Sequence, residues 1–535
     1  MSAPVTRSTG PAPAATTSMT HREVIEALSG LLLAMFVAML SSTVVSSALP
    51  RIVADLDGTE SGYTWVVVAT LLTLTATTPL WGKLADLFSK KALVQLALLI
   101  FVAGSVVAGL APNMGVLIGA RALQGVGVGG LSALVQIVIA SMVTARDRGR
   151  YFGYLGAVFA VATVSGPLIG GLIVDTSWLG WRWCFYVGIP FAVVALLVLQ
   201  KTLHLPTIKR DVSIDYAGAL LVTAGVSLLL IWVSLAGTQF PWASWTTAWM
   251  VGLGLALLAG FIVAETRVPE PIIPLHLFRD RTISLAVFAS VMVGVAMFGS
   301  TVFLVQYFQI SRGMSPTRAG LMTLAMVGGL LVSSIVTGRI IAATGVWKRY
   351  LVGGAVLMVV GIVLLSTIDP QISLFSVGCY MAVLGIGMGA VNQNLVLAVQ
   401  NNAAQRDIGA ASSLAAFFRT MGGSIGVSAL GAALGHSVSS GVTSGLARLG
   451  IAMPAEQGGA TSIPNLAELP APVREVFQDA LANATGHIFW LAAPFAVIAL
   501  VAILAIREAP LRTTIEREDE LEQLASASAG APVSD

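Results

Sequence analysis

Fourteen long apolar stretches dominate this chain and limit the folds open to it. An α-helix needs about 20 apolar residues to cross about 30 Å of hydrocarbon. The chain has 535 residues, of which 56% are hydrophobic and only 10% charged, and soluble domains of this size do not show that balance. We therefore predict an all-α polytopic membrane protein with spans at 28–49, 64–81, 92–111, 115–143, 151–173, 183–200, 216–236, 246–264, 283–310, 317–343, 350–367, 374–400, 409–435 and 485–506.

The distribution of lysine and arginine sets the predicted orientation. With the N-terminus in the cytoplasm, the cytoplasmic segments hold 21 of the 29 basic residues, the outside segments hold 6, and 2 lie within spans. Cytoplasmic loops of membrane proteins carry this excess. The net charge of +3 therefore reflects topology and gives no reason to expect a nucleic-acid partner. We expect a multi-pass protein of the cell membrane with both termini cytoplasmic.

The chain also repeats itself. GKLADLFSKKAL from Gly82 has a divergent copy, GRIIAATGVWKRYL, 256 residues later, and GVGVGGLSALVQ from Gly125 has a copy, GIGMGAVNQNLV, 260 residues later. Nearly equal offsets indicate two related six-helix bundles with two extra helices between them, an architecture typical of transporters. The expected segments are a disordered N-terminus 1–27 without a cleavable signal, a bundle 28–200, extra helices and linkers 201–282, a bundle 283–506 with an outside loop 436–484, and a cytoplasmic tail 507–535.

Three segments outside the spans have patterns of their own. PEPIIPLHLFRDR from Pro269 predicts a short interfacial helix. The tail after Arg507 is acidic and then rich in alanine and serine, as expected of a solvated end. Within the outside loop, helical spacing places one apolar face on Val473, Val476, Phe477, Ala480 and Leu481.

Four motifs fall on these spans in a consistent order. GKLADLFSKK from Gly82 resembles the loop 2–3 motif of the major facilitator superfamily, RALQGVGVGG from Arg121 resembles its span 4 motif, and GPLIGG from Gly166 resembles the span 5 signature of its antiporters. With WRWCFYVGIP from Trp181 and fourteen spans, residues 28–510 are similar to the fourteen-span drug:proton antiporters of that superfamily. The resemblance implies the major facilitator fold and a secondary active transporter.

The resemblance also implies a gate at the cytoplasmic end, with candidate residues Gly82, Asp86, Lys90 and Lys91. In similar proteins this acid holds the inner gate closed, partly against the N-terminus of the helix that corresponds to 409–435, where the helix dipole favours an anion. Its repeat counterpart in the second half is Ala342, so only one half would carry this contact.

Gly166 and Pro167 are the second gating candidate. Proline interrupts the backbone hydrogen bonds of a helix, so the pair is expected to break the ladder in mid-membrane and to allow a bend. In the family that bend is linked to antiport. Here Ala162 stands where the longer motif has glycine.

The first span departs from the family pattern at its outer half, LSSTVVSSALP, where Ser41 stands in place of an aspartate. The hydroxyls of Ser41, Ser42 and Thr43 can bond a guanidinium or each other, or bend the helix by bonding a carbonyl four residues back. They do not titrate. Arg121 is expected at a similar depth to Ser41, and a charge within a span almost always faces a cavity or a partner.

All 26 acids fall in loops, tails or span ends. A proton-coupled exporter needs a group that is exposed to each side in turn and changes its charge, and arginine does not release its proton. The candidates left for proton coupling are Asp57, Asp175, His436 and His487.

Polar side chains that can line a substrate cavity are concentrated in the ninth, twelfth and thirteenth spans, with one more on the fourth. Each alone is as readily a helix–helix hydrogen bond as a ligand contact. The candidate substrate-binding residues are Ser41, Ser42, Thr43, Arg121, Gln124, Gln306, Gln309, Asn392, Gln393 and Arg419.

These patterns predict an exporter of amphiphilic drugs or metabolites that works by alternating access and is driven by protons. Two arginines and no carboxylate within the spans favour neutral, anionic or lipid-like substrates over cations. Two alternatives stay open, a transporter of lipids guided by the 436–484 loop and an uncoupled facilitator.

The chain is not expected to be an enzyme, because its spans hold no acid, no paired histidines and no Cys/His dyad. It contains no Gly-x-x-x-x-Gly-Lys-Ser/Thr loop for ATP. Cys184 and Cys379 match no metal or redox spacing and are expected to be buried. We therefore expect a monomer without metal or cofactor, whose partners are a small amphiphilic substrate, protons and the lipid bilayer.

Overall fold

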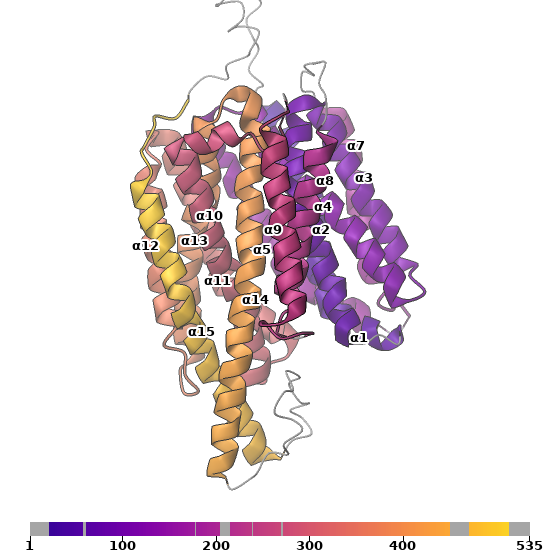
Figure 1. Cartoon of the computed structure of the whole chain (residues 1–535), viewed down its shortest axis with the longest axis vertical. Coiled ribbons are helices and arrows are strands. Elements are labelled where there is room, and N and C mark those ends of the chain that lie inside the picture. Colours follow the sequence, from indigo (N-terminus) through magenta and orange to yellow (C-terminus); the bar gives the residue numbers. More distant parts are fainter. Residues whose placement is uncertain are drawn as a thin grey trace, which may run out of the picture.

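The computed structural model describes residues 21–56, 60–176, 178–203, 215–237, 239–268, 271–449 and 470–512. Within these ranges fourteen helices are long and apolar enough to cross a membrane. The predicted all-α fold and its number of spans are confirmed. The helices stand side by side in one bundle, as Figure 1 shows.

The helices follow the expected order of six, two and six. The first half contains α1 (His21–Asp55), α2 (Glu60–Leu87), α3 (Lys90–Gly109), α4 (Met114–Met142), α5 (Ala145–Asp175), and the short α6 (Trp183–Tyr186) continued by α7 (Gly188–Thr202). The extra helices are α8 (Tyr216–Leu235) and α9 (Trp245–Glu265), followed by the one-turn η1 (Leu275–Arg279). The second half contains α10 (Arg281–Gln306), η2 (Tyr307–Ser311), α11 (Pro316–Thr344), α12 (Lys348–Leu365), α13 (Leu374–Asn402), η3 (Gln405–Asp407), α14 (Ile408–Arg448) and α15 (Ala471–Ala505).

The two halves meet along two equivalent helix pairs. In one pair α2 of the first half packs beside α14 of the second, and in the other α11 packs beside α5. The extra helices α8 and α9 pack on each other, and α8 also contacts α2 and α14. In Figure 1, α2 ends and α3, α5 and α14 begin at the upper end. We call this the upper end and the opposite one the lower end.

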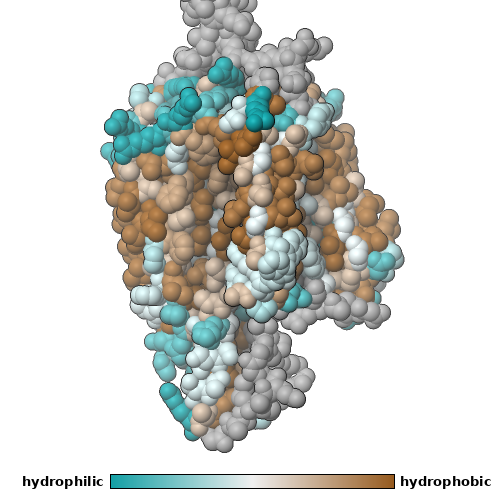
Figure 2. Space-filling view, viewed as in Figure 1, coloured by the Kyte–Doolittle hydropathy of each residue, from teal (hydrophilic) through white to brown (hydrophobic). Residues whose placement is uncertain are grey.

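The outer surface has the distribution of side chains expected for a bilayer. Figure 2 shows hydrophobic side chains in a band across the middle and hydrophilic ones at the upper end. Large apolar side chains such as Leu172, Leu220 and Val332 are exposed. Contiguous exposed apolar surface of this extent fits lipid contact.

Both described ends of the predicted outside loop 436–484 are helical, and residues 450–469 lie outside the described ranges. α14 continues to Arg448 and α15 already begins at Ala471, so the two form a helical hairpin that extends beyond the other helices at the lower end (Figure 1). The expected apolar face of 473–481 is present: Leu481 is buried in the main core, and the other four residues pack against α14. The seam consists of Val438, Val442, Leu446, Val473, Val476, Phe477 and Ala480.

Both ends of the chain also differ from expectation. α1 begins at His21, within the segment 1–27 predicted to be disordered, whereas residues 1–20 lie outside the described ranges. The start of the predicted solvated tail is bound to the protein. The Glu508 carboxylate accepts hydrogen bonds from the N–H groups of Trp347 and Lys348, both at 3.1 Å, at the start of α12.

Two smaller predictions have different outcomes. Cys184 is buried as expected, but Cys379 is exposed on α13, so the prediction for this residue is wrong. The expected interfacial helix after Pro269 is a single 3₁₀ turn, η1, and Pro269 itself lies outside the described residues.

Candidate functional site

At the upper end, the carboxylate of Asp86 joins the two halves. Asp86 lies in the last turn of α2, opposite the start of α14, where backbone N–H groups have no partner within the helix. Its Oδ1 accepts a hydrogen bond from the N–H of Gly409 and its Oδ2 from that of Ala410, both at 2.8 Å. An anion is stabilised there by the helix dipole as well. We call this contact the α2–α14 junction.

The junction requires close approach of the two backbones. A side chain on Gly82 would collide with Ser413, and a side chain on Gly409 would lie 2.5 Å from the carbonyl oxygen of Gly82. Next to it, Asp407 pairs with Nε2 of His276 at 3.0 Å, so η1 is also tied to the start of α14. Glycine at both positions therefore lets Asp86 reach the helix terminus.

A second junction joins α5 to α11 at the same end. The guanidinium of Arg146 donates from Nε to the carbonyl of Ala342 at 2.9 Å and from Nη2 to that of Ala343 at 2.8 Å. These carbonyls lie in the last turn of α11, where the helix dipole favours a cation. A Cβ on Gly338 would collide with the backbone of Gly149. We call this contact the α5–α11 junction.

The internal repeat relates the two junctions. Arg146, Asp147 and Gly149 at the start of α5 recur 260 residues later as Arg406, Asp407 and Gly409 at the start of α14. Gly82 and Gly338 are likewise repeat counterparts. Arg146 is one of the 21 basic residues of the predicted cytoplasmic segments, and this repeated Arg-Asp-x-Gly pattern is the sequence signal that could have identified it as a contact between the halves.

A buried arginine reinforces the contact between the halves. Arg148, only 5% exposed, donates to the carbonyls of Val143 at 3.1 Å and Ala140 at 2.7 Å, and to Oε1 of Gln400 at 3.3 Å. Gln400 in turn donates to the Ser412 hydroxyl at 2.9 Å. This chain of bonds links α4, α5, α13 and α14.

The two lysines of the predicted gate point to different partners. Lys90 begins α3, is half-buried and lies within electrostatic range of Asp86. Lys91 donates from Nζ to the carbonyl of Gln200 at the end of α7, at 2.7 Å. Lys91 therefore ties α3 to α7 within the first half.

In α1, the predicted hydroxyl cluster packs against α5. Thr43 Oγ1 bonds the carbonyl of Met39 four residues back at 3.2 Å, and also the carbonyl of Ala162 on α5 at 3.2 Å. A Cβ on Gly166 would collide with Thr43, so glycine is required for this approach. α5 continues as one helix through Gly166 and Pro167, although Pro167 has no N–H to donate to the carbonyl four residues back. Ser42 is half-buried beside Thr43.

Arg121 is held within the first half. Nη1 donates to Oε1 of Gln124 at 2.9 Å and Nε to the carbonyl of Val66 at 3.3 Å, while Gln124 donates to the Ser105 hydroxyl at 2.7 Å. Ser41 is buried, and its hydroxyl has no hydrogen-bond partner among the described residues. The idea that the α1 hydroxyls bond the guanidinium is therefore wrong for Ser41.

The second half keeps polar groups with unused capacity. Oδ1 of Asn392 and Oε1 of Gln393 on α13 are buried and accept no hydrogen bond within the described part of the chain. Arg419 on α14 is half-buried. Gln306 ends α10, and Gln309 lies in the π-helical turn η2, a local geometry frequent at functional sites. Both glutamines are half-buried.

Two of the four candidates for proton coupling, His436 and His487, have side chains that the structure describes. Asp57 lies outside the described residues, and Asp175 is the last residue of α5, its side chain not described. His436 is exposed on the hairpin. His487 is exposed as well, with Nδ1 3.2 Å from the Ser437 hydroxyl and its ring stacked on Trp490.

Comparison with known proteins identifies the family. The model of the Major Facilitator Superfamily matches residues 31–427. The chain belongs to this superfamily. The multidrug transporter protein MdtP of Bacillus subtilis is 35% identical over 76% of this chain and 74% of its own length. The efflux pump dotC of Dothistroma septosporum is 34% identical over 91% of this chain and 84% of its own.

A solved structure supports the fold. The human organic anion transporter MFSD10 superposes with a TM-score of 0.59 over 90% of this chain and 99% of that one, at 13% sequence identity. As a member of the Major Facilitator Superfamily, the protein is a secondary transporter with small-molecule cargo.

Sequence reasoning missed Arg148 and Gln400, because their roles depend on which helices meet between the two halves.

Proposed function

We propose that the protein exports amphiphilic drugs or metabolites from the cytoplasm by alternating access, with its upper end in the cytoplasm. Support comes from relatives named as a multidrug transporter and an efflux pump, which match most of this chain. The excess of lysine and arginine in the loops of the upper end supports the orientation.

One observation carries the mechanism: the Asp86 carboxylate of the first half accepts both N–H groups at the start of α14 in the second half. With the α5–α11 junction also formed, the halves are held together at the upper end. We assign the structure to the conformation closed to the cytoplasm. Loading of cytoplasmic substrate then requires both junctions to open, and their re-formation commits the substrate to release on the other side.

We infer the substrate class from which arginine side chains within the spans already have hydrogen-bond partners. Arg121 is satisfied by Gln124 and Val66, so it offers little to a ligand. Arg419 on α14 has no comparable partner among the described residues, and the neighbouring helix α13 carries the unused amide oxygens of Asn392 and Gln393. We propose that these three side chains contact the substrate, and that anionic or neutral amphiphiles are exported in preference to cations.

We propose that a proton gradient drives export, although no acid lies in the membrane-crossing middle of α1. His436, His487, Asp57 and Asp175 remain the candidates for proton coupling.

The test uses protein in liposomes that contain a pH dye, with anionic, neutral and cationic amphiphiles of similar size. We expect uptake of anionic and neutral compounds with coupled proton movement, and a preference that shifts towards cations in Arg419→Gln. Arg150→Gln, at an exposed arginine of the upper end, is the matched control. A cation as best substrate of the wild type would contradict the substrate class. Transport without proton movement would make the protein an uncoupled facilitator.

A further inference from the structure

The indole of Trp81 fixes the gate end of α2 on α4. Its N–H donates to the carbonyl of Val126 at 3.0 Å, and the side chain is only 5% exposed. A Cβ on Gly130 of α4 would lie 2.6 Å from the ring, so the ring fills the space that this glycine leaves. Trp81 is followed directly by Gly82 of the α2–α14 junction. It therefore attaches the part of α2 that carries the junction to the first half.

Three further side-chain bonds join the same two helices farther from the gate. Thr70 Oγ1 donates to the carbonyl of Arg121 at 3.1 Å, and Thr73 Oγ1 donates to that of Ala122 at 2.7 Å. Arg121 Nε donates in the opposite direction, to the carbonyl of Val66 on α2 at 3.3 Å. Hydrogen bonds are short and directional, so a slide of α2 along α4 breaks all four. We call these four bonds the α2–α4 lock.

The equivalent helix pair of the second half, α11 and α13, lacks such a lock. By the repeat, the four donors correspond to Met326, Gly329, Thr337 and Met381. Gly329 has no side chain, and a Cβ there would lie 2.5 Å from the carbonyl oxygen of Ala382. Thr337 bonds the carbonyl of Ser333 in its own helix at 2.6 Å. Within the described residues no side-chain hydrogen bond joins α11 to α13, although the two helices pack along each other.

The two helix pairs therefore resist sliding to different degrees. A slide of α2 on α4 would leave the buried indole N–H of Trp81 without an acceptor, which is unfavourable. A slide of α11 on α13 costs packing contacts alone. The hydroxyl of Ser334 on α11 is consistent with this freedom: the residue is 4% exposed, and its hydroxyl has no partner among the described residues. The position of α11 in this structure thus leaves one buried polar group unpaired.

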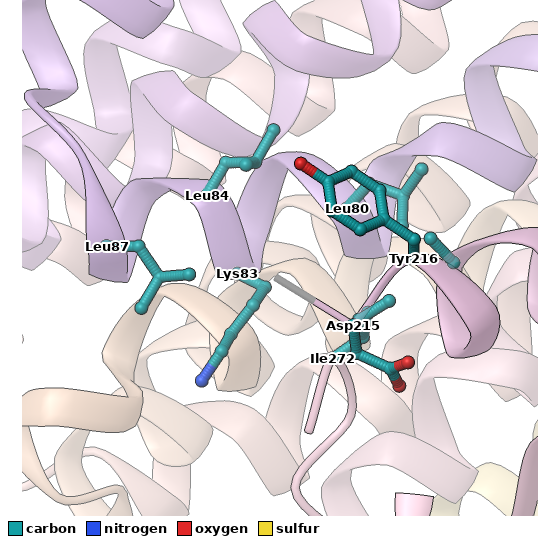
Figure 3. A pocket seen from close by; sticks show the side chains of 8 residues that line it. Leu80, Lys83, Leu84, Leu87, Asp215, Tyr216 and Ile272 are labelled. Carbon is teal, nitrogen blue, oxygen red and sulfur yellow. The ribbon is translucent and has the colours of Figure 1, made fainter. Parts of the chain in front are cut away.

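Another neighbour of α2, the helix α8, leaves a space beside the gate. A cavity of about 240 Å³ lies between α2 and the start of α8. In Figure 3 the side chains of Leu84 and Leu87 from α2 lie on one side of this space, and Asp215 lies on the other. Side chains that border a cavity lack packing partners on that side. We infer that α4, rather than α8, determines where the upper end of α2 lies.

We propose that the four donors of the α2–α4 lock are positioning residues of the gate, which make α2 and α4 move as one unit. The α2–α14 junction then opens by movement of the second half, in which α11 shifts along α13. The inference rests on the proposed function, since it assigns the moving parts of the same transport cycle. It gives Arg121 a role in the gate that requires neither an acidic partner nor a substrate.

Distances between spin labels test this division of the molecule. The full chain is placed in nanodiscs after its two native cysteines have been replaced by alanine. One pair of labels is attached through Phe88→Cys and Thr144→Cys, next to the upper ends of α2 and α4. The second pair is attached at the repeat counterparts, through Thr344→Cys and Ala404→Cys, next to the upper ends of α11 and α13. All four side chains are exposed or partly exposed, and the distances are measured by electron paramagnetic resonance without any substrate.

The first comparison removes the lock. Trp81→Phe keeps an aromatic ring but loses the indole donor, and Thr73→Val keeps the shape of the side chain but loses the hydroxyl. We expect the distribution of distances between labels 88 and 144 to broaden in each variant and most in the double variant. The distribution between labels 344 and 404 should be unchanged. If one single variant fails to fold, the other gives the same test.

Two matched controls accompany this comparison. Thr78 is 2% exposed, and its hydroxyl bonds the carbonyl of Leu74 in its own helix at 2.6 Å, so Thr78→Val should keep the wild-type distribution. Trp232→Phe loses an indole bond to Thr247 between α8 and α9 and should keep it as well. A distribution in Trp81→Phe/Thr73→Val as narrow as that of the wild type would overturn the lock.

The second comparison weakens the gate with Asp86→Asn. We expect the distance between labels 344 and 404 to shift by about 2 Å or more, and the distance between labels 88 and 144 to stay the same. A shift of the first-half pair as large as that of the second-half pair contradicts the proposal. If neither pair moves, the movement assigned to α11 is wrong and so is the gate of the proposed function. The lock itself is then still decided by the first comparison.

Discussion

The α2–α14 and α5–α11 junctions close the same end of the molecule with opposite charges. Both depend on a glycine of one half lying against the backbone of the other, at positions related by the internal repeat. At the first an acid, Asp86, binds the N-terminus of a helix, and at the second a base, Arg146, binds the C-terminus of one. The repeat has kept the close approach of the backbones, whereas the charge that completes each contact differs.

The helix dipole explains why either charge works. A helix presents unpaired N–H groups at its start and unpaired carbonyls at its end, so an anion suits the first and a cation the second. At the α2–α14 junction the charge is on the helix that ends, and at the α5–α11 junction it is on the helix that begins. Each junction can therefore be weakened on its own, which allows their contributions to be compared.

The largest effect is expected from Gly338→Ala. The added Cβ collides with the carbonyl oxygen of Gly149, which is backbone and cannot turn aside, so the upper end cannot close. We expect transport in liposomes to fall more than about tenfold, since steric overlap in a packed interface costs about 1–3 kcal/mol. Gly82→Ala first meets the Ser413 side chain and should be milder. Gly353→Ala on α12 is the control, because its added Cβ meets nothing within 4 Å. Wild-type transport by Gly338→Ala would contradict the close approach of α5 and α11.

Asp86→Asn should follow in size. The amide keeps one acceptor for the start of α14 but loses the charge and the second bond, and hydrogen bonds to charged groups contribute about 1.5–3 kcal/mol. We expect a loss of transport of about tenfold and faster hydrogen exchange at Gly409 and Ala410, measured by mass spectrometry. Glu26→Gln, an exposed acid near the same end, should leave both unchanged. Unchanged exchange at 409–410 in Asp86→Asn would count against the contact.

Arg146→Gln should weaken the α5–α11 junction by less. Its partners are neutral carbonyls at a partly exposed helix end, where a cation contributes about 0.3–1 kcal/mol. We expect a two- to fivefold loss of transport and faster hydrogen exchange at the end of α11, with no change at 409–410. Arg150→Gln, at an exposed arginine one turn away, is the control. An effect as large as that of Asp86→Asn would mean that the two junctions contribute equally.

The smallest effect is expected from Glu508→Gln, outside both junctions. Glu508 binds the N–H groups of Trp347 and Lys348 at the start of α12 within the second half. Loss of its charge should lower the melting temperature by a few degrees at most, because an exposed charge at a helix terminus contributes about 0.3–1 kcal/mol. Transport should be unchanged. A transport defect would show that the C-terminal segment also takes part in closing the upper end.

Hydropathy and family motifs predicted the spans and the six-two-six order, because crossing a bilayer imposes a length and a composition on every helix. The loop 2–3 motif also predicted Asp86 as a residue of the cytoplasmic gate. The apolar face at 473–481 predicted a helix within the outside loop, but the continuation of α14 to Arg448 was missed, because residues 436–448 are too polar for a membrane window. The pairing of Arg121 with Gln124 follows from their spacing of three residues on α4, whereas the bond of Arg121 to Val66 on α2 was missed, because depth along a helix does not specify which neighbouring helix a side chain faces.

The length of α14 has a consequence for observing the protein at work. This helix runs without a break for 41 residues from the α2–α14 junction to Arg448, and it is about 60 Å long. If it tilts by about 10° around its middle when the junction opens, its far end moves by about 5 Å. Because the helix is continuous, opening of the junction on one side of the membrane displaces the hairpin on the other side. A fluorescent label near Arg448 would report the opening of the distant gate in intact cells.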